Sequence, residues 1–254
     1  MRIISYNVNG IRAAQTKGLA DWLKKVSPDV VCFQEIKALE TDVPKEVIES
    51  GPYHAYWYPA EKKGYSGVGI LSKTKPKHVE YGCGISEYDR EGRVLRADFK
   101  DFSVMSVYCP SGTTGGERQE FKEKFMTDFR PYAKGLTKRF PNLVISGDFN
   151  ICHKEIDIHN PVSNKNSSGF LPHEREWLGE FLDTGFTDSF RHLNADPHNY
   201  TWWSYRSGAR ARNLGWRIDY HMVSKDLTPA VQGHRIFSKA MHSDHCPMEL
   251  ELSF

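Results

Sequence analysis

The sequence predicts a layered α/β fold. Eight short runs rich in Val, Ile, Phe or Tyr recur along the chain, and turn-forming residues bound most of them. Between some of these runs the apolar residues follow helical spacing instead. Because strands alternate irregularly with a few helices, we expect helices to be layered against sheets. The strand-like runs lie at 2–6, 30–33, 67–71, 94–99, 102–108, 142–146, 217–223 and 247–252.

Three segments carry the helical spacing. Apolar residues recur at i, i+3, i+4 and i+7 within 19–26, which predicts a short amphipathic helix. Three phenylalanines within 121–129 fall on one face of a second helix, which Pro131 should end or kink. The third helix should begin at Pro172, where proline is tolerated, and stop at Gly185.

Composition limits the class of protein. The 254 residues contain no literal repeat and no linker rich in Pro or Gly, so residues 1–254 are expected to form one domain. The net charge is +2, so any nucleic-acid-binding surface must be local. The five cysteines include no C-x-x-C pair, which favours reduced thiols. Without a signal peptide or a membrane-length apolar run, a soluble cytoplasmic protein with no membrane contact is expected.

Polar side chains follow several of the predicted strands at the point where each strand ends. Catalytic groups commonly lie in such positions, on loops held by a rigid scaffold. Taken singly, each residue is better explained as a solvated strand end or a turn residue. Taken together, the same pattern at separate strand ends favours a shared site. The residues are Asn7, Asn9, Glu35, Tyr108, Asp148, Asn150, Asp244 and His245.

The residue types in this group are typical of divalent-metal chemistry on phosphates. Oxygen ligands suit Mg²⁺, with Mn²⁺ as a substitute, and Mg²⁺ keeps positions open for waters and phosphate oxygens. Glu35 is the expected first ligand. Asp148 is the expected base that takes a proton from water, and Asn150 is expected to orient that water.

Phosphodiester hydrolysis also needs donors aimed at the phosphoryl oxygens, where negative charge builds up. His245, Asn7 and Tyr108 are the candidates for that role. A carboxylate behind the histidine would fix its tautomer, and Asp219 is the candidate for it.

Residues 202–217 combine four arginines with four aromatic side chains and contain no acidic residue. Arginines contact phosphates, and aromatic side chains stack on bases or wall off a sugar pocket. A hydrophobic hairpin with solvated arginines is the open alternative. The polar loop 157–170 and the Lys62–Lys63 turn are further candidates for DNA contact, and for the turn simple exposure is an equal alternative. The arginines are Arg206, Arg210, Arg212 and Arg217.

Seven motifs, in order and spacing, resemble the exonuclease III family of abasic-site endonucleases, within the endonuclease/exonuclease/phosphatase superfamily. The resemblance covers nearly the whole chain, and the ordered set is far more specific than any single motif. It implies a four-layer sandwich in which two mixed β-sheets pack face to face with helices outside. The motifs are SYNVNGIR, FQEIK, VYCPSG, SGDFN, EID-x-HNP, WRIDY and SDHCP.

The resemblance also implies residue roles. Metal binding falls to Glu35, with Asn7 and Asp244 nearby, and catalysis to Asp148, Asn150, His245, Tyr108, Asp219 and Asn7. The family's pocket for a flipped-out abasic sugar corresponds to Trp202, Trp216 and Ile218, and the loop with Asn160 would lie along the DNA. Ser111 stands where several relatives carry Asn, which puts one phosphate or leaving-group contact in question.

The function that this resemblance implies is DNA repair. The chain is expected to be a monomeric Mg²⁺-dependent nuclease that cuts double-stranded DNA 5′ to an abasic site. It is also expected to trim blocked 3′ ends or 3′-terminal nucleotides, as a 3′–5′ exonuclease, 3′-phosphodiesterase or 3′-phosphatase. Two alternatives stay open: a superfamily phosphatase or phosphodiesterase for non-DNA substrates, and a catalytically silent DNA-binding module.

Overall fold

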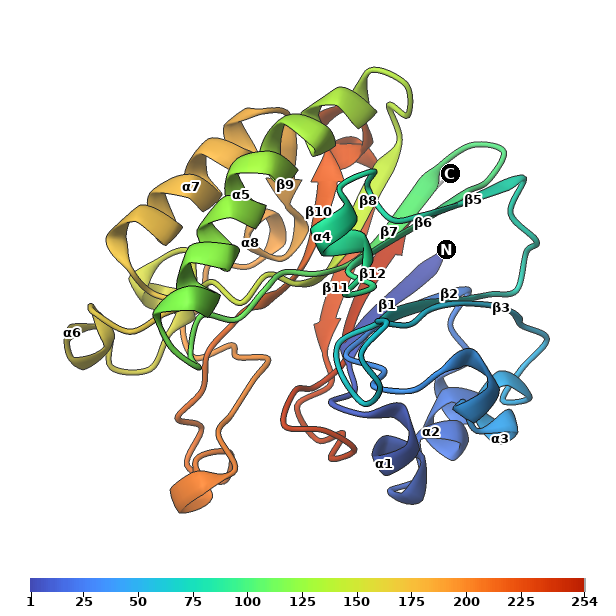
Figure 1. Cartoon of the computed structure of the whole chain (residues 1–254), viewed down its shortest axis with the longest axis horizontal. Helices are drawn as coiled ribbons and strands as arrows, with labels where there is room; N and C mark the ends of the chain where they lie inside the picture. The colour runs from blue at the N-terminus through green and yellow to red at the C-terminus, as the bar shows by residue number, and fades with distance from the viewer. Residues whose placement is uncertain (254) are drawn as a thin grey trace.

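Two six-stranded mixed β-sheets lie face to face, and helices cover their outer faces (Figure 1). The computed structural model describes residues 1–253. In Figure 1 the helices α1, α2 and α3 cover one sheet, and α5, α7 and α8 cover the other. The four-layer sandwich expected from the sequence is therefore confirmed, whereas the assignment of 1–254 to one domain stays a prediction.

The first sheet has the strand order β11-β12-β1-β2-β4-β3. Only β1 and β2 run parallel in it, and their register places Asn7 opposite Gln34. Asn7 therefore lies beside the point where the chain leaves β2 towards Glu35. The strands are β1 (Arg2–Asn7), β2 (Val30–Gln34), β3 (His54–Tyr58), β4 (Val68–Ser72), β11 (Val231–Ile236) and β12 (Met248–Leu252).

The second sheet has the order β5-β6-β7-β8-β10-β9. Its one parallel pair, β7 and β8, places Tyr108 opposite Asp148, and the antiparallel pair β8 and β10 places Asp148 opposite Asp219. Each sheet thus brings polar strand ends together at its centre. The strands are β5 (His78–Tyr81), β6 (Val94–Asp98), β7 (Ser103–Tyr108), β8 (Leu143–Asp148), β9 (Phe186–Asp188) and β10 (Asp219–Ser224).

All eight predicted strands are present, and four further strands escaped prediction. The four are β3, β5, β9 and β11, which are the edge strands of the two sheets. An edge strand has one neighbour and more contact with water, so its sequence lacks the continuous apolar run that marks a central strand. In β5, for example, three of the four residues are exposed.

The predicted helices at 19–26 and from Pro172 are confirmed. Of the two outcomes expected at Pro131, an end or a kink, the end is wrong, and the kink stays a prediction. Helix α5 runs on to Thr137 with Pro131 inside it. Proline removes one backbone hydrogen bond, yet Phe129 and Ala133 on either side of it are buried against the second sheet. The helices are α1 (Ile11–Thr16), α2 (Leu19–Val26), α3 (Lys45–Ile48), α4 (Ser86–Asp89), α5 (Gly116–Thr137), α6 (Pro161–Asn164), α7 (Pro172–Asp183) and α8 (Ser189–Leu193). Short 3-10 helices lie at Glu40–Asp42, Glu155–Asp157, Arg206–Gly208 and Lys225–Ala230.

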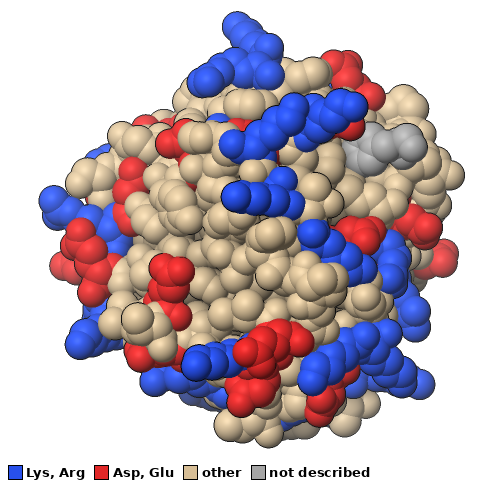
Figure 2. Space-filling model, turned by 90° about the vertical axis from the view of Figure 1, so that its right-hand side faces the viewer, with Lys and Arg blue, Asp and Glu red and all other residues tan. Residues whose placement is uncertain are grey.

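Surface charge on one face is mixed rather than basic. Figure 2 shows the right-hand side of Figure 1, where basic and acidic side chains are interspersed around an uncharged centre. This face offers no continuous surface of one sign, in keeping with the small net charge. Among the helices of residues 1–253, none has the length and apolar character that a membrane crossing requires.

A buried histidine links the two sheets. His221 of β10 lies with one ring nitrogen, Nε2, 3.1 Å from the carbonyl oxygen of Met248 in β12. A carbonyl oxygen only accepts, so Nε2 carries the hydrogen and Nδ1 accepts from the Ser146 hydroxyl at 2.7 Å. Burial lowers the pKa of His221 to about 4, although the bond to Met248 favours the charged form.

This histidine should make the fold sensitive to acid. An unfolded histidine binds a proton below about pH 6.5, whereas folded His221 does so only near pH 4, so the unfolded state binds more protons between these values and stability falls as pH falls. We expect His221 to contribute a loss of about 3 kcal/mol over this window. Chemical denaturation at several pH values should show a shallower loss for His221→Gln; an equal loss in both proteins would contradict the assignment.

Candidate active site

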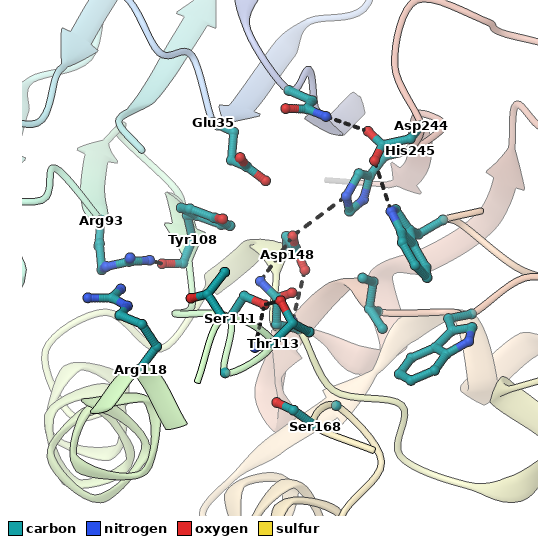
Figure 3. A pocket seen from close by; sticks show the side chains of 18 of the residues that line it. Glu35, Arg93, Tyr108, Ser111, Thr113, Arg118, Asp148, Ser168, Asp244 and His245 are labelled. Carbon is teal, nitrogen blue, oxygen red and sulfur yellow. Dashed lines mark hydrogen bonds and ion pairs between the residues drawn. The ribbon is translucent and has the colours of Figure 1, made fainter. Parts of the chain in front are cut away.

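The polar strand ends meet at one end of the two sheets, around a cavity of about 770 Å³. Figure 3 shows Glu35, Tyr108, Asp148 and His245 facing a common space, although they come from four separate parts of the chain. The cavity also contains the apolar side chains expected in the pocket. Of the predicted site residues it is lined by Asn9, Glu35, Tyr108, Ser111, Asp148, Asn150, Trp202, Trp216, Ile218, Asp244 and His245.

Asn7 ties the two sheets together at this end. Its amide nitrogen donates to Glu35 Oε1 at 2.8 Å and to Asp148 Oδ2 at 2.9 Å, while its side-chain oxygen accepts from the Asn9 backbone at 3.0 Å. Asn7 is fully buried, so these partners satisfy groups that would be costly to leave unpaired. One amide therefore sets the separation of two carboxylates that belong to different sheets.

Two carboxylates, Glu35 and Asp148, form a candidate metal site, and His245, which carries a proton on each ring nitrogen, lies beside it as a donor. Ligand atoms of Glu35, Asp148 and His245 all lie within 4.8 Å of one another. Two facing carboxylates favour a cation between them, and the Lys37 ammonium already lies 2.8 Å from Glu35 Oε2. The donor set is rich in oxygen, which fits a hard divalent cation. Asp148 was expected as a base, and the structure adds it to the possible ligands.

The ligand roles expected for Asp244 and Asn7 stay predictions. Both Asp244 oxygens already accept hydrogen bonds, from Asn9 Nδ2 and from Trp202 Nε1, each at 3.0 Å. Burial raises the pKa of Asp244, but His245 and these donors prevail and lower it overall. Asp244 is thus held ionised beside the group formed by Glu35, Asp148 and His245.

Backbone conformation turns two of these side chains into the cavity. Glu35 and Asn150, each just beyond a strand, have φ of 49° and 53°, a left-handed conformation that side chains rarely adopt. The turn at Asn150 brings its backbone N–H to Asp148 Oδ1 at 2.8 Å and its amide to the Cys109 carbonyl at 2.9 Å. Such strain persists where the surrounding contacts determine it, and it concentrates at functional sites.

Burial controls the charge of Asp148. Burial raises its pKa, as do the neighbouring carboxylates Asp219 and Glu35, whereas His245 and the Asn150 N–H oppose the rise. A carboxylate whose pKa lies closer to neutrality is a stronger base than an ordinary aspartate. The environment therefore suits Asp148 for taking a proton from water.

His245 is held as a cation. Burial lowers the pKa of His245, but the Asp219 carboxylate, 2.9 Å from Nδ1, has the larger opposite effect, and the pKa rises overall to about 10. With both ring nitrogens protonated, Nδ1 donates to Asp219 and Nε2 faces Asp148 Oδ2 at 3.8 Å. The arrangement places a positive N–H at the cavity, whereas the sequence predicted a donor whose tautomer Asp219 fixes, and the role of His245 towards a phosphate stays a prediction.

Tyr108 remains a neutral donor. Burial raises the pKa of its phenol well above 10, and the nearby Glu35 carboxylate adds to the rise. The guanidinium carbon of Arg93 lies 4.8 Å from the centre of the Tyr108 ring, and the guanidinium donates to the Tyr108 carbonyl at 2.8 Å. The hydroxyl thus keeps its hydrogen and can donate into the cavity.

An apolar wall lies beside these polar groups. The rings of Trp202 and Trp216 meet edge to face, with centroids 5.8 Å apart, and pack with Ile218 and Phe170. The Trp202 N–H is used by Asp244, which fixes the ring against the polar half of the site. A pocket with one apolar side and one polar side is what a sugar-phosphate requires.

The arginines expected on DNA are not brought to this cavity. Arg206 and Arg212 are exposed on the excursion at the lower left of Figure 1, around the 3-10 helix Arg206–Gly208. Arg210 instead donates to backbone carbonyls of 238–243 and covers the Trp203 ring at 4.6 Å. Their contact with DNA stays a prediction, which the bonds made by Arg210 do not favour.

One residue in each of the predicted DNA-contacting segments 202–217 and 157–170 stabilises the fold instead. Arg217 is fully buried and pairs with Asp157 at 2.8 Å and Asp188 at 2.7 Å. Asn160 caps the short helix α6 by accepting from Ser163 N–H. A buried ion pair and a helix cap explain these residues without DNA.

Several cavity residues were missed. Arg93 and Arg118 line the cavity and share Glu91, while Lys37 lies beside Glu35. Of the predicted turn with Lys62 and Lys63, only Tyr65 reaches the cavity. Arginines before a strand or within a helix carry no sequence signal that separates them from solvated charges. The additional lining residues are Lys37, Tyr65, Arg93, Gly112, Thr113, Thr114, Gly115, Arg118, Ser167, Ser168 and Gly169.

Comparison with known proteins agrees with this geometry. Residues 4–245 match the model of the "Endonuclease/Exonuclease/phosphatase family". The chain is 44% identical to "DNA repair nuclease APEX1" of Danio rerio, over 100% of this chain and 82% of that protein. It is 43% identical to "Exodeoxyribonuclease" of Bacillus subtilis, over 98% of each. It superposes with a TM-score of 0.91 and 29% identity on an AP endonuclease structure from Archaeoglobus fulgidus, covering 100% of both chains. The resemblance seen in the motifs is confirmed.

The Asp219–His245 pair yields a direct test of the site's electrostatics. In Asp219→Asn the carboxylate charge is gone while burial remains, so the pKa of His245 should fall from about 10 into or below the ordinary histidine range near 6.5. NMR titration of the ring in metal-free protein measures it. A pKa that stays near 10 in the variant would show that another group holds the proton.

Proposed function

We propose that this chain, which belongs to the endonuclease/exonuclease/phosphatase family, is a Mg²⁺-dependent DNA repair nuclease that hydrolyses the phosphodiester 5′ to abasic sites. The observation that carries the proposal is the meeting of Glu35, Asp148 and His245 within 4.8 Å, beside the wall of Trp202 and Trp216. The names of its relatives, a DNA repair nuclease and an AP endonuclease, support the same substrate.

The residues divide the chemistry between them. Asp148 takes a proton from a water, which attacks phosphorus in line, and Asn150 holds that water and the Asp148 carboxylate in place. The bond between phosphorus and the 3′ oxygen of the preceding nucleotide breaks, and this oxygen takes a proton from solvent and leaves as a 3′-hydroxyl. His245 and Tyr108 line the cavity, where each can donate to a phosphoryl oxygen on which negative charge builds. The Asn7 amide donates to Glu35 and Asp148 and so fixes both carboxylates beside them. When bound by Glu35, a divalent cation supplies Lewis-acid polarisation of the phosphate and lowers the charge of the carboxylate cluster.

The apolar wall supplies selectivity for the lesion. An abasic sugar carries no base, so turning it out of the duplex breaks no base pair. Trp202, Trp216 and Ile218 offer it a mainly apolar surface, on which the Trp202 N–H is already donated to Asp244. An intact nucleotide would have to unpair and unstack before it reached the same place, which costs a few kcal/mol.

The same centre also serves DNA 3′ ends. A 3′-phosphate, a 3′-blocking group and a 3′-terminal nucleotide all present a phosphorus atom to the same base and donors. Ser111 lines the cavity and exchanges a hydrogen bond with Thr113 at 3.0 Å, so a small hydroxyl stands where relatives carry an amide. We propose 3′–5′ exonuclease and 3′-phosphatase or phosphodiesterase activity beside the abasic-site activity, in a cytoplasmic monomer.

Removal of the base should stop the chemistry and spare binding. With Asp148→Asn and an abasic duplex in Mg²⁺, we expect kcat to fall by at least about 10²-fold, because general base catalysis contributes that much or more. The dissociation constant for the duplex, measured by fluorescence anisotropy, should change little. Asp226→Asn, an exposed carboxylate elsewhere on the surface, is the matched control and should behave as wild type.

The same assay decides between the proposal and its rivals. Abasic, 3′-phosphate and undamaged recessed-end duplexes are offered in parallel, each in Mg²⁺ and in EDTA, together with an inositol phospholipid. Wild-type rates for Asp148→Asn would remove Asp148 from the mechanism, and full activity in EDTA would remove the metal. Turnover of the phospholipid without turnover of DNA would favour the non-DNA phosphatase, and binding without any cleavage would favour the silent module.

A further inference from the structure

A fully buried lysine lies behind the catalytic turn. Lys122, in α5, has no solvent exposure, and neither has its partner Glu174, in α7. Their Nζ and Oε1 atoms are 2.5 Å apart. Lysine and glutamate are almost never fully buried unless they are paired. A buried pair of this kind contributes little net stability, because the desolvation of both charges offsets their attraction. Its presence therefore needs another explanation.

The ammonium of Lys122 contacts the catalytic turn directly. It donates to the backbone carbonyl of Asn150 at 2.9 Å. Asn150 is in the left-handed conformation, which asparagine tolerates better than most residues with a side chain, and the bond from Lys122 holds the carbonyl of this turn in place. Through its own N–H and amide, Asn150 in turn holds Asp148 Oδ1 and the Cys109 carbonyl. Lys122 thus fixes the one turn that aims both Asp148 and Asn150.

The carboxylate of Glu174 contacts a second loop that lines the cavity. Its Oε2 accepts from the backbone N–H groups of Gly169 at 2.6 Å and Leu171 at 3.1 Å. The two loops are also bonded to each other, since Cys152 N–H donates to the Gly169 carbonyl at 2.7 Å. Gly169 fits here because a side chain would press on Trp216 and on the Asn150 carbonyl. The pair therefore connects the catalytic turn with the loop beneath the apolar wall.

We infer that Lys122 is a positioning residue for hydrolysis, which acts through Asn150 to hold the Asp148–Asn150 turn, whereas Glu174 holds the loop at Gly169. The inference rests on the proposed function, because it assigns Lys122 to the same reaction. Lys122 touches neither the cavity nor a substrate, so its effect should fall on kcat and leave KM in place. A displacement of about 1 Å in a catalytic group can lower a rate by about 10²-fold.

The test separates the hydrogen bond to Asn150 from the charge of the pair. Lys122→Met alone would leave an unpaired buried carboxylate, so the informative variant is Lys122→Met/Glu174→Gln, in which both charges are gone. The amide oxygen of glutamine can still accept from Gly169 and Leu171, but nothing donates to the Asn150 carbonyl. We expect kcat on the abasic duplex to fall by roughly 10- to 100-fold, with KM within about threefold of wild type and thermal stability nearly unchanged.

Two single variants complete the design. Glu174→Gln keeps Lys122 and its bond to Asn150 but leaves the buried ammonium without a counter-charge, so we expect lower thermal stability, with most of kcat retained at temperatures where the variant is folded. Glu180→Gln removes a second ion pair between α7 and α5, with Arg130, which is partly exposed and remote from the turn; it is the matched control and should leave kcat and KM unchanged. If the double variant does not fold, Lys122→Leu/Glu174→Gln, which also has no donor at position 122, takes its place with the same expected loss.

The outcomes distinguish this inference from the proposed function. A folded double variant with wild-type kcat would overturn the positioning role, as would a fall in kcat of equal size in Glu174→Gln. A change in KM alone would assign the pair to substrate binding instead. If wild-type protein leaves the abasic duplex uncut, the proposed function itself fails, and the variants are then not the cause.

Discussion

The bond network of one buried amide, that of Asn7, is the interaction on which the site depends. Its nitrogen donates to Glu35 beyond β2 and to Asp148 at the end of β8, so it joins the two sheets across their interface. The central parallel pair of each sheet places these strand ends at the same end of the sandwich. Without that clamp the two carboxylates would repel each other, and neither sheet alone would define their distance.

The ionisable side chains around Asn7 differ in charge and in role. Glu35 and Asp148 share the space next to Asn7, Asp219 keeps His245 protonated, and Asp244 is held ionised by donors beside them. The cluster contains more carboxylates than cations, and a divalent ion is the simplest way to balance them. The same burial that makes the cluster reactive requires support from behind, which the Lys122–Glu174 pair supplies through backbone contacts.

Local signals predicted the central strands and the polar strand ends at the cavity, because an apolar run that ends in a carboxylate or an amide is visible in the sequence. The repeated pattern favoured one shared site, but the contacts that join Asn7, Glu35 and Asp148 could not be derived, since register between distant strands is not a local property. Edge strands such as β5 were missed because most of their side chains face water, so their sequences lack the apolar run that marks a central strand. Buried charges were missed for a related reason: Lys122 and Arg217 look like solvated residues, and only the fold reveals the partners that neutralise them.

The central claim is that strand ends from both sheets form one divalent-cation site. Anomalous diffraction from crystals soaked in Mn²⁺ tests it most directly. A strong anomalous peak is expected about 2.0–2.5 Å from a carboxylate oxygen of Glu35, within the space shared with Asp148 and His245. Peaks confined to surface carboxylates, with this space empty at saturating Mn²⁺, would contradict it.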